Sequence, residues 1–131
     1  MDDALCMNLI DAAQKAMPHS YAPYSNLTVG AAGLWDSGQI YSGCNIENAS
    51  YGLTICAERC AIFKAVSEGA KVLKAIAVIS SRSEIIRPCG ACLQVMLEFC
   101  NDPDEMLIIA ASLEKSYDVY HLSDYLPRAF R

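Results

Sequence analysis

The sequence predicts an α/β domain in which helices cover a mixed β-sheet. Two short runs, 75–79 and 106–111, consist almost entirely of isoleucine, valine, leucine and alanine, which is typical of strands covered on both faces. Segments with helical periodicity precede and separate these runs. The 131 residues are 53% hydrophobic and 19% charged, which suffices for a core, so we expect residues 1–131 to form a single domain.

The first third of the chain predicts one helix followed by a β-hairpin. Apolar residues recur at helical spacing from Asp2 to Met17, an aspartate can cap the start, and Pro18 ends the segment. After a turn-rich loop, 27–35 has the composition of a strand. Asp36-Ser37-Gly38 is typical of a hairpin turn, and 39–44 is the expected return strand.

The rest of the chain predicts two further helices, 56–67 and 88–100, the second with Pro88 near its start. A short strand is expected at 118–121, followed by a turn at 124–126 that Ser123 could cap. The first of these helices should be largely buried, because apolar residues cover much of its circumference. These residues are Ala57, Cys60, Ala61, Phe63, Ala65 and Val66.

The composition also restricts the class of partner. The net charge is −5 and the pI about 4.8, whereas a nucleic-acid-binding protein usually carries a basic face, so we expect no nucleic-acid partner. No apolar run is long enough to span a bilayer, so we expect no membrane partner. The acidic start of the chain lacks the basic residues of a signal peptide, which predicts a cytoplasmic protein.

Seven cysteines in a cytoplasmic chain point to metal binding or catalysis. Cys56, Cys89 and Cys92 lie at two predicted helix starts, where the helix dipole and free N–H groups favour the thiolate that binds metal. Three thiolates are one ligand short of a closed tetrahedral zinc site, and catalytic zinc sites leave that fourth position to water. The sequence therefore predicts one Zn²⁺ per chain.

Glu58 follows Cys56 by two residues, so it can lie near the metal without ligating it. There it could accept a proton from the metal-bound water and return it to a substrate. Three thiolates and one Zn²⁺ ion together carry a net negative charge, and the neighbouring Arg59 is the cation best placed to offset that charge. Cysteines at this spacing together with this glutamate favour an enzyme over a structural zinc site.

Several motifs, in order along nearly the whole chain, resemble those of the small tetrameric zinc-dependent cytidine deaminases. The matching stretches are Tyr21-Ala22-Pro23-Tyr24-Ser25, Val29-Gly30-Ala31-Ala32, Gly43-Cys44-Asn45-Ile46-Glu47-Asn48, Tyr51-Gly52, Cys56-Ala57-Glu58-Arg59, Pro88-Cys89-Gly90-Ala91-Cys92 with Gln94, Leu126-Pro127 and Ala129-Phe130.

The resemblance implies a three-layer α/β/α fold with a five-stranded mixed sheet. It implies hydrolysis of cytidine and 2′-deoxycytidine to the uridines with release of ammonia, a step of pyrimidine salvage. In that reaction zinc-bound water attacks C4 of the base and a glutamate, here Glu58, shuttles the proton.

The resemblance also assigns roles to individual residues. Cys56, Cys89 and Cys92 would hold zinc. The side chains expected at the substrate would be Asn45 and Glu47 at the ribose hydroxyls, the backbone of Ala57 at the base edge, and Leu27 against the pyrimidine. Tyr51 and Phe130 would reach active sites of neighbouring subunits in a homotetramer.

Two positions depart from the family pattern. The family usually has phenylalanine at the position of Leu27, where the ring stacks on the pyrimidine, and leucine loses that geometry. It usually has arginine at the position of Leu93, so Arg59 would carry more of the charge compensation. We expect weaker pyrimidine binding or a shifted substrate preference.

Three alternatives remain open at this point. The chain could act on another aminopyrimidine nucleoside, as the blasticidin S deaminases do on the same scaffold. It could be a non-catalytic zinc module, with Cys60, one helical turn after Cys56, as a fourth ligand. Editing of polynucleotides is less compatible with the acidic composition.

Overall fold

A five-stranded mixed sheet forms the centre of the computed structural model, which describes residues 1–131. The strand order is β2-β1-β3-β4-β5; β3 and β4 are parallel, and the other neighbours are antiparallel. The strands are β1 (Val29–Trp35), β2 (Ile40–Cys44), β3 (Leu73–Ser80), β4 (Leu107–Ala111) and β5 (Tyr117–His121).

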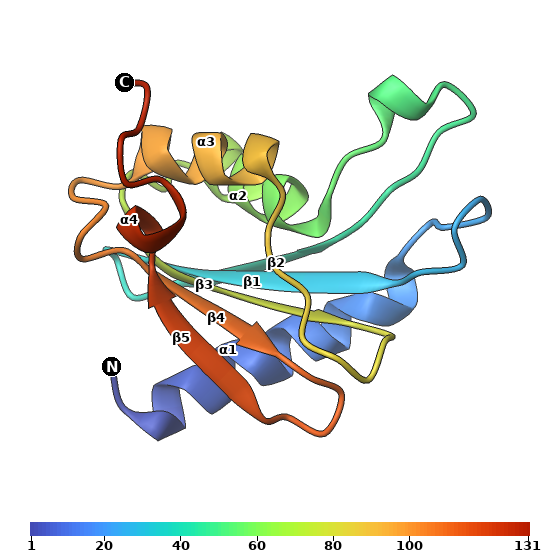
Figure 1. Cartoon of the computed structure of the whole chain (residues 1–131), viewed down its shortest axis with the longest axis horizontal. Coiled ribbons are helices and arrows are strands. Elements are labelled where there is room, and N and C mark those ends of the chain that lie inside the picture. Colours follow the sequence, from blue (N-terminus) through green and yellow to red (C-terminus); the bar gives the residue numbers. More distant parts are fainter.

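Helices cover both faces of the sheet, which confirms the predicted three-layer α/β/α arrangement (Figure 1). α1 (Asp3–Ala16) lies on one face, while α2 (Ala57–Ser67) and α3 (Gly90–Phe99) lie on the other. α4 (Leu122–Tyr125) follows β5, and two 3₁₀ turns occur at Met17–His19 and Tyr51–Leu53. None of the helices is both long and apolar enough to cross a membrane.

The alternation of side chains along β3 builds a core on each face of the sheet. Ile76 and Val78 pack among 19 buried residues beneath α2 and α3. Ala75, Ala77 and Ile79 point the opposite way and belong to a cluster of 10 buried residues beneath α1. The continuously apolar sequence of this strand is therefore explained by burial on both faces.

Two glycines let the helices approach the sheet closely. A Cβ on Gly30 would lie 1.9 Å from the carbonyl oxygen of Ala13 in α1. A Cβ on Gly43 would lie 2.5 Å from the backbone nitrogen of Ala61 in α2. Gly43 thus sets how near β2 lies to the helix that begins next to Cys56.

The predicted elements all occur, with boundaries that shift by one or two residues. Two details of the prediction were wrong. Ser123 does not cap the last helix, because His121 is its N-cap and pairs with Asp124 in a capping box. Phe63 is 47% exposed, because it lies on the side of α2 that faces away from the sheet.

Candidate active site and metal centre

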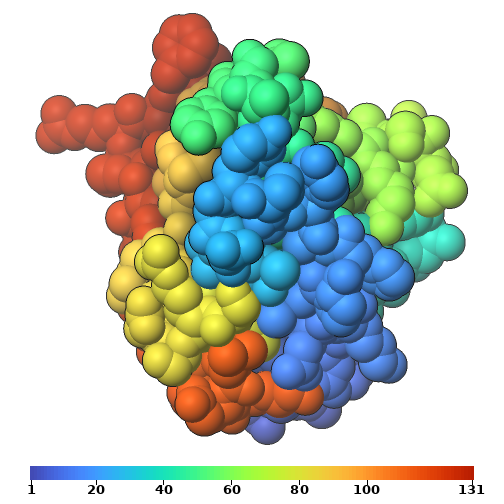
Figure 2. Space-filling model, turned by 90° about the vertical axis from the view of Figure 1, so that its right-hand side faces the viewer, coloured from blue at the N-terminus to red at the C-terminus, as the bar shows by residue number.

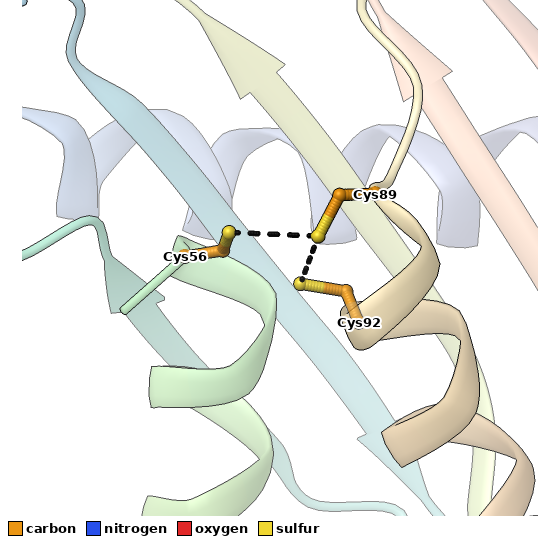
Figure 3. A group of neighbouring side chains, drawn as sticks. All are labelled: Cys56, Cys89 and Cys92. Carbon is orange, nitrogen blue, oxygen red and sulfur yellow. Dashed lines mark hydrogen bonds between the residues drawn. The ribbon is translucent and has the colours of Figure 1, made fainter. Parts of the chain in front are cut away.

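Three cysteine sulfurs converge between the starts of α2 and α3 (Figure 3). The Sγ atoms of Cys56 and Cys89 are 3.7 Å apart, and those of Cys89 and Cys92 are 3.5 Å apart. All three lie within 4.8 Å of one another. The structure thus brings together the three ligands that the sequence predicted and leaves Cys60 outside the cluster.

The spacing of the sulfurs fits a zinc ion. A tetrahedral ion with Zn–S bonds of about 2.3 Å separates its sulfur ligands by about 3.8 Å. The observed distances lie near this value and far above the roughly 2.05 Å of a disulfide. Three sulfur donors leave one tetrahedral position free, as in a catalytic rather than a structural zinc site. The alternative of a site closed by Cys60 is not supported.

Both ligand-bearing helices begin at a cysteine. Cys56 is the N-cap of α2 and Cys89 is the N-cap of α3, each with an extended backbone and no capping hydrogen bond from its side chain. Their sulfurs are therefore free to point toward each other (Figure 3). The positive ends of two helix dipoles meet at the cluster, and this field stabilises thiolates.

The charge at the sulfurs is balanced by one arginine. Arg59 donates a hydrogen bond from Nη2 to the Sγ atom of Cys56 over 3.5 Å. Interaction with the Cys92 thiol, together with Arg59, lowers the pKa of Cys56 to about 5. The hydrogen bond to Cys56 raises the pKa of Cys92, and burial and repulsion by the neighbouring negative charges of Glu58 and Cys56 act in the same direction. A divalent cation among the sulfurs removes this repulsion.

Leu93 occupies the position where the family pattern has a second arginine. Its side chain is buried in the core beneath α2 and α3. It therefore makes a packing contact and contributes no charge to the sulfurs, so Arg59 is the cation in contact with the cluster.

Glu58 lies in the first turn of α2, beside the sulfurs, and is only 4% exposed. Burial raises its pKa to about 7, and the charge of Cys56 acts in the same direction. A carboxyl group with a pKa near neutrality can both accept and donate a proton at physiological pH.

Cys56, Cys89 and Glu58 line a cavity of about 310 Å³. Three chain segments surround it, and Figure 2 shows them together on one end of the molecule: the blue loop 21–28, the green segment leading to α2 and the yellow segment leading to α3. Its lining residues are Ser25, Leu27, Val29, Asn45, Glu47, Thr54, Ile55, Cys56, Ala57, Glu58, Ile86, Arg87 and Cys89.

Asn45 and Glu47, predicted at the ribose, line this cavity and also hold its walls together. The Asn45 side chain accepts the N–H of Val29 over 2.9 Å and donates to the carbonyl of Leu27 over 2.8 Å. The Glu47 carboxylate accepts hydrogen bonds from the segment Tyr24–Ser25. Each side chain thus fixes the loop that carries Leu27.

Tyr51 and Phe130 lie outside the cavity formed around the sulfurs. Tyr51 is 75% exposed and lines an adjoining cavity of about 360 Å³. Its ring meets that of Tyr24 edge to face, with 5.8 Å between the ring centroids. Phe130 is 85% exposed, and its backbone carbonyl accepts a hydrogen bond from Gln94. The described chain does not bring Phe130 to its own cavity.

No role was predicted from the sequence for three polar or charged residues of the cavity, nor was one of the hydrogen bonds that hold its wall. Ser25, Thr54 and Arg87 line it together with predicted residues, and Arg87 also extends across the ring of Tyr120. Ser25 lies in a motif that matched the family, but nothing in its local pattern indicates a contact with Glu47, 22 residues later. The hydrogen bond from the Val29 N–H to the Asn45 side chain was not predicted either, because it joins residues 16 positions apart.

Comparison with known proteins places this geometry in a family. Residues 6–109 match the model of the cytidine and deoxycytidylate deaminase zinc-binding region. A cytidine deaminase of Sporosarcina psychrophila is 46% identical over 122 residues, covering 93% of this chain and 88% of the relative. A probable cytidine deaminase of Dictyostelium discoideum is 42% identical over 92% of this chain and 86% of its own length.

Solved structures agree with the sequence comparison. The crystal structure of cytidine deaminase from Burkholderia pseudomallei superimposes with a TM-score of 0.89 at 42% identity, covering 99% of this chain and 100% of that one. The enzyme from Mycobacterium tuberculosis gives a TM-score of 0.84 at 38% identity, over 100% of this chain and 99% of that one. The chain therefore belongs to the family defined by the cytidine and deoxycytidylate deaminase zinc-binding region.

Proposed function

We propose that this protein is a zinc-dependent deaminase that hydrolyses cytidine and 2′-deoxycytidine to uridine and 2′-deoxyuridine, with release of ammonia. The observation that carries this proposal is the convergence of three thiols beside the buried Glu58, at one wall of a cavity of about 310 Å³. Relatives named as cytidine deaminases at 42–47% identity favour this substrate.

Cys56, Cys89 and Cys92 would hold one Zn²⁺ per chain. When bound, zinc lowers the pKa of a water molecule so that it acts as a nucleophile at neutral pH. Glu58 accepts a proton from the attacking water and delivers it to the amino group that leaves C4 as ammonia. Its pKa of about 7 suits both steps.

The remaining cavity residues would orient the nucleoside. Asn45 and Glu47 present hydrogen-bonding groups at the cavity wall and would bind the ribose hydroxyls. The backbone at Ala57, at the start of α2, would read the polar edge of the base. Leu27 contributes the apolar contact on the face of the ring.

Tyr51 and Phe130 would complete active sites of neighbouring subunits in a homotetramer. Their exposure supports this role, because aromatic side chains exposed at 75% and 85% gain burial from a partner. Two hydrogen bonds anchor the tail to α3, because Gln94 in the helix donates to the carbonyl of Phe130 and Arg131 donates to the carbonyl of Cys100 at the end of the helix, so Phe130 projects from an anchored segment.

We further propose that residues 1–131 form one domain, because both cores share the same sheet. A cytoplasmic location is supported by the seven free thiols, which a reducing compartment preserves.

The proposal is tested by following cytidine absorbance with zinc-loaded protein and with the variant Glu58→Gln. Loss of the cytosine band with wild type, and at least a hundredfold slower loss with the variant, is the expected result. Blasticidin S is assayed in parallel. Turnover of blasticidin S without turnover of either cytidine nucleoside would show that the proposed substrate is wrong, while hydrolytic deamination would remain the reaction.

A further inference from the structure

The carboxylate of Glu47 is fixed by the loop opposite it. Its Oε1 atom accepts the N–H groups of Tyr24 over 2.9 Å and of Ser25 over 3.2 Å. Its Oε2 atom accepts the hydroxyl of Ser25. Three donors from two adjacent residues therefore determine which way the carboxylate faces.

The same hydroxyl continues the contact to Leu27. Ser25 Oγ accepts the backbone N–H of Leu27 over 3.0 Å while it donates to Glu47. Asn26, between them, has a φ of 57°, which tightens the chain so that Ser25 and Leu27 can meet in this way. Asn45 holds the carbonyl of Leu27 from the other side. The ribose side and the base side of the cavity are thus joined through one serine hydroxyl.

The hydrogen bonds also keep Glu47 ionised. The Ser25 hydroxyl contributes most to lowering the pKa of Glu47, and the N–H groups of Tyr24 and Ser25 act in the same direction. An ionised carboxylate accepts but does not donate hydrogen bonds, so it suits ribose hydroxyls, which donate. Because Oε1 already accepts two backbone N–H groups, the hydrogen bond from the Ser25 hydroxyl determines how the lone pairs of Oε2 are oriented.

From this network we infer that Ser25 is a positioning residue, which orients the Glu47 carboxylate for one ribose hydroxyl and couples that contact to the placement of Leu27 against the base. The inference deepens the proposed function and rests on it. Ser25 touches the substrate-binding side chains, and its own contribution is made through them.

The test measures KM and kcat for the variants Ser25→Ala, Ser25→Thr and Glu47→Gln with cytidine, 2′-deoxycytidine and 3′-deoxycytidine. Glu47→Gln should lose the least activity on one of the two deoxynucleosides. The hydroxyl that this nucleoside lacks is then the one that Glu47 binds. Ser25→Ala should raise KM for cytidine about tenfold, as expected for one charge-assisted hydrogen bond, with a smaller change in kcat. Ser25→Thr, which keeps the hydroxyl, should restore KM.

If Ser25 acts through Glu47, the change in KM should depend on which ribose hydroxyl the nucleoside carries. A purely structural serine would give the same change on every nucleoside. On the nucleoside that Glu47→Gln identifies, the KM of Ser25→Ala should lie within about twofold of the wild-type KM. This nucleoside lacks the hydroxyl, so wild type and variant both lack its hydrogen bond to Glu47. Ser37→Ala, in the turn between β1 and β2 at the other end of the sheet, is the matched control and should leave KM unchanged.

Two results would overturn the inference. One is an equal loss on all three nucleosides, and the other is no rescue by threonine. If Ser25→Ala unfolds, Ser25→Cys keeps the shape with a weak donor, and unchanged KM in that variant would count against the role of the hydroxyl. If wild type deaminates none of the nucleosides, the proposed function fails, and the inference fails with it.

Discussion

Charge at the sulfur cluster depends on Arg59. Three thiolates bring more negative charge than a Zn²⁺ ion carries, and hydrogen bonds to ligand sulfur reduce that excess. The Nη2 contact of Arg59 with Cys56 provides such a bond, while Leu93 packs into the core instead of supplying a second cation. Zinc affinity should therefore be more sensitive to Arg59 than to any other surface arginine.

Replacing Arg59 with glutamine should weaken zinc binding about 10- to 100-fold, the range found when partners of metal ligands are removed. Competition with a chromophoric chelator measures this directly and independently of turnover. Arg82→Gln, an exposed arginine outside the cavity, is the control and should bind zinc as wild type does. Equal affinities in all three proteins would show that the contact of Arg59 with Cys56 does not stabilise the metal.

Leu27 lines the cavity and would offer the pyrimidine an apolar surface without an aromatic ring. A ring–ring contact contributes about 0.5–1.5 kcal/mol beyond its buried area, so Leu27→Phe should lower KM for cytidine by about two- to tenfold. Steady-state kinetics measure the change. Leu27→Met keeps the apolar contact without a ring and should stay within about twofold of wild type. Comparable kcat/KM for Leu27→Phe and wild type would contradict the importance of stacking at this position.

Local spacing was enough to predict the three thiols that the structure brings together. Cys56 and Glu58 lie within one helical turn, and Cys89 and Cys92 lie within another, so helix geometry places Glu58 near the Cys56 sulfur and lets Cys89 and Cys92 converge. Ser25 could not be recognised in this way, because its role arises from a contact with Glu47 that only the fold creates. Exposure of Phe63 was missed for a similar reason, since periodicity does not say which side of a helix stays open.

The start of α2 is positioned by its contact with β2. Gly43 faces the helix so closely that a methyl group would meet the backbone of Ala61 at 2.5 Å and that of Ala57 at 3.0 Å. Since Ala57 follows the ligand Cys56, displacement of the helix at this point also displaces the metal site. The strand order that creates this contact was not predicted, because the composition of a strand does not specify its neighbours in the sheet.

Substitution of Gly43 by alanine should destabilise the fold by about 1–3 kcal/mol, the usual effect of overpacking. Thermal unfolding of the zinc-loaded protein should show a Tm at least about 4 °C lower. Gly52→Ala is the matched control, since a Cβ there would have no neighbour within 4 Å. A Gly43→Ala variant as stable as Gly52→Ala would mean that α2 can move away without loss of packing.

Zinc also links two separate elements of the molecule. Cys56 is the N-cap of α2, Cys89 is the N-cap of α3 and Cys92 lies in its first turn, so a bound ion would fasten the two helices to each other. A ligand that binds only the folded state stabilises it by about 4 kcal/mol at a thousandfold excess over its Kd. Chelation should therefore lower Tm, and added zinc should restore it. In Cys56→Ser the Tm should respond less to chelation, and a wild-type Tm indifferent to chelation would contradict this link.

Assembly of the whole molecule can be tested by mixing two damaged variants. Glu58→Gln lacks the proposed proton carrier, and Phe130→Ala lacks the exposed aromatic side chain of the tail. If Phe130 completes a neighbour's active site, subunits exchanged between these variants should form some sites with both groups intact. Activity of the mixture should then exceed the sum of the separate activities. Purely additive activity, with subunit exchange verified by mass, would contradict shared sites.

Hydrolytic deamination at C4 is tested most directly by isotope transfer from the solvent. Cytidine is incubated with zinc-loaded protein in ¹⁸O-labelled water, and the nucleoside product is examined by mass spectrometry. Attack of water at C4, with Glu58 moving the proton, predicts uridine that carries the heavy isotope on the base, together with an equal amount of ammonia. Unchanged cytidine, or uridine without the label, would contradict the proposed reaction.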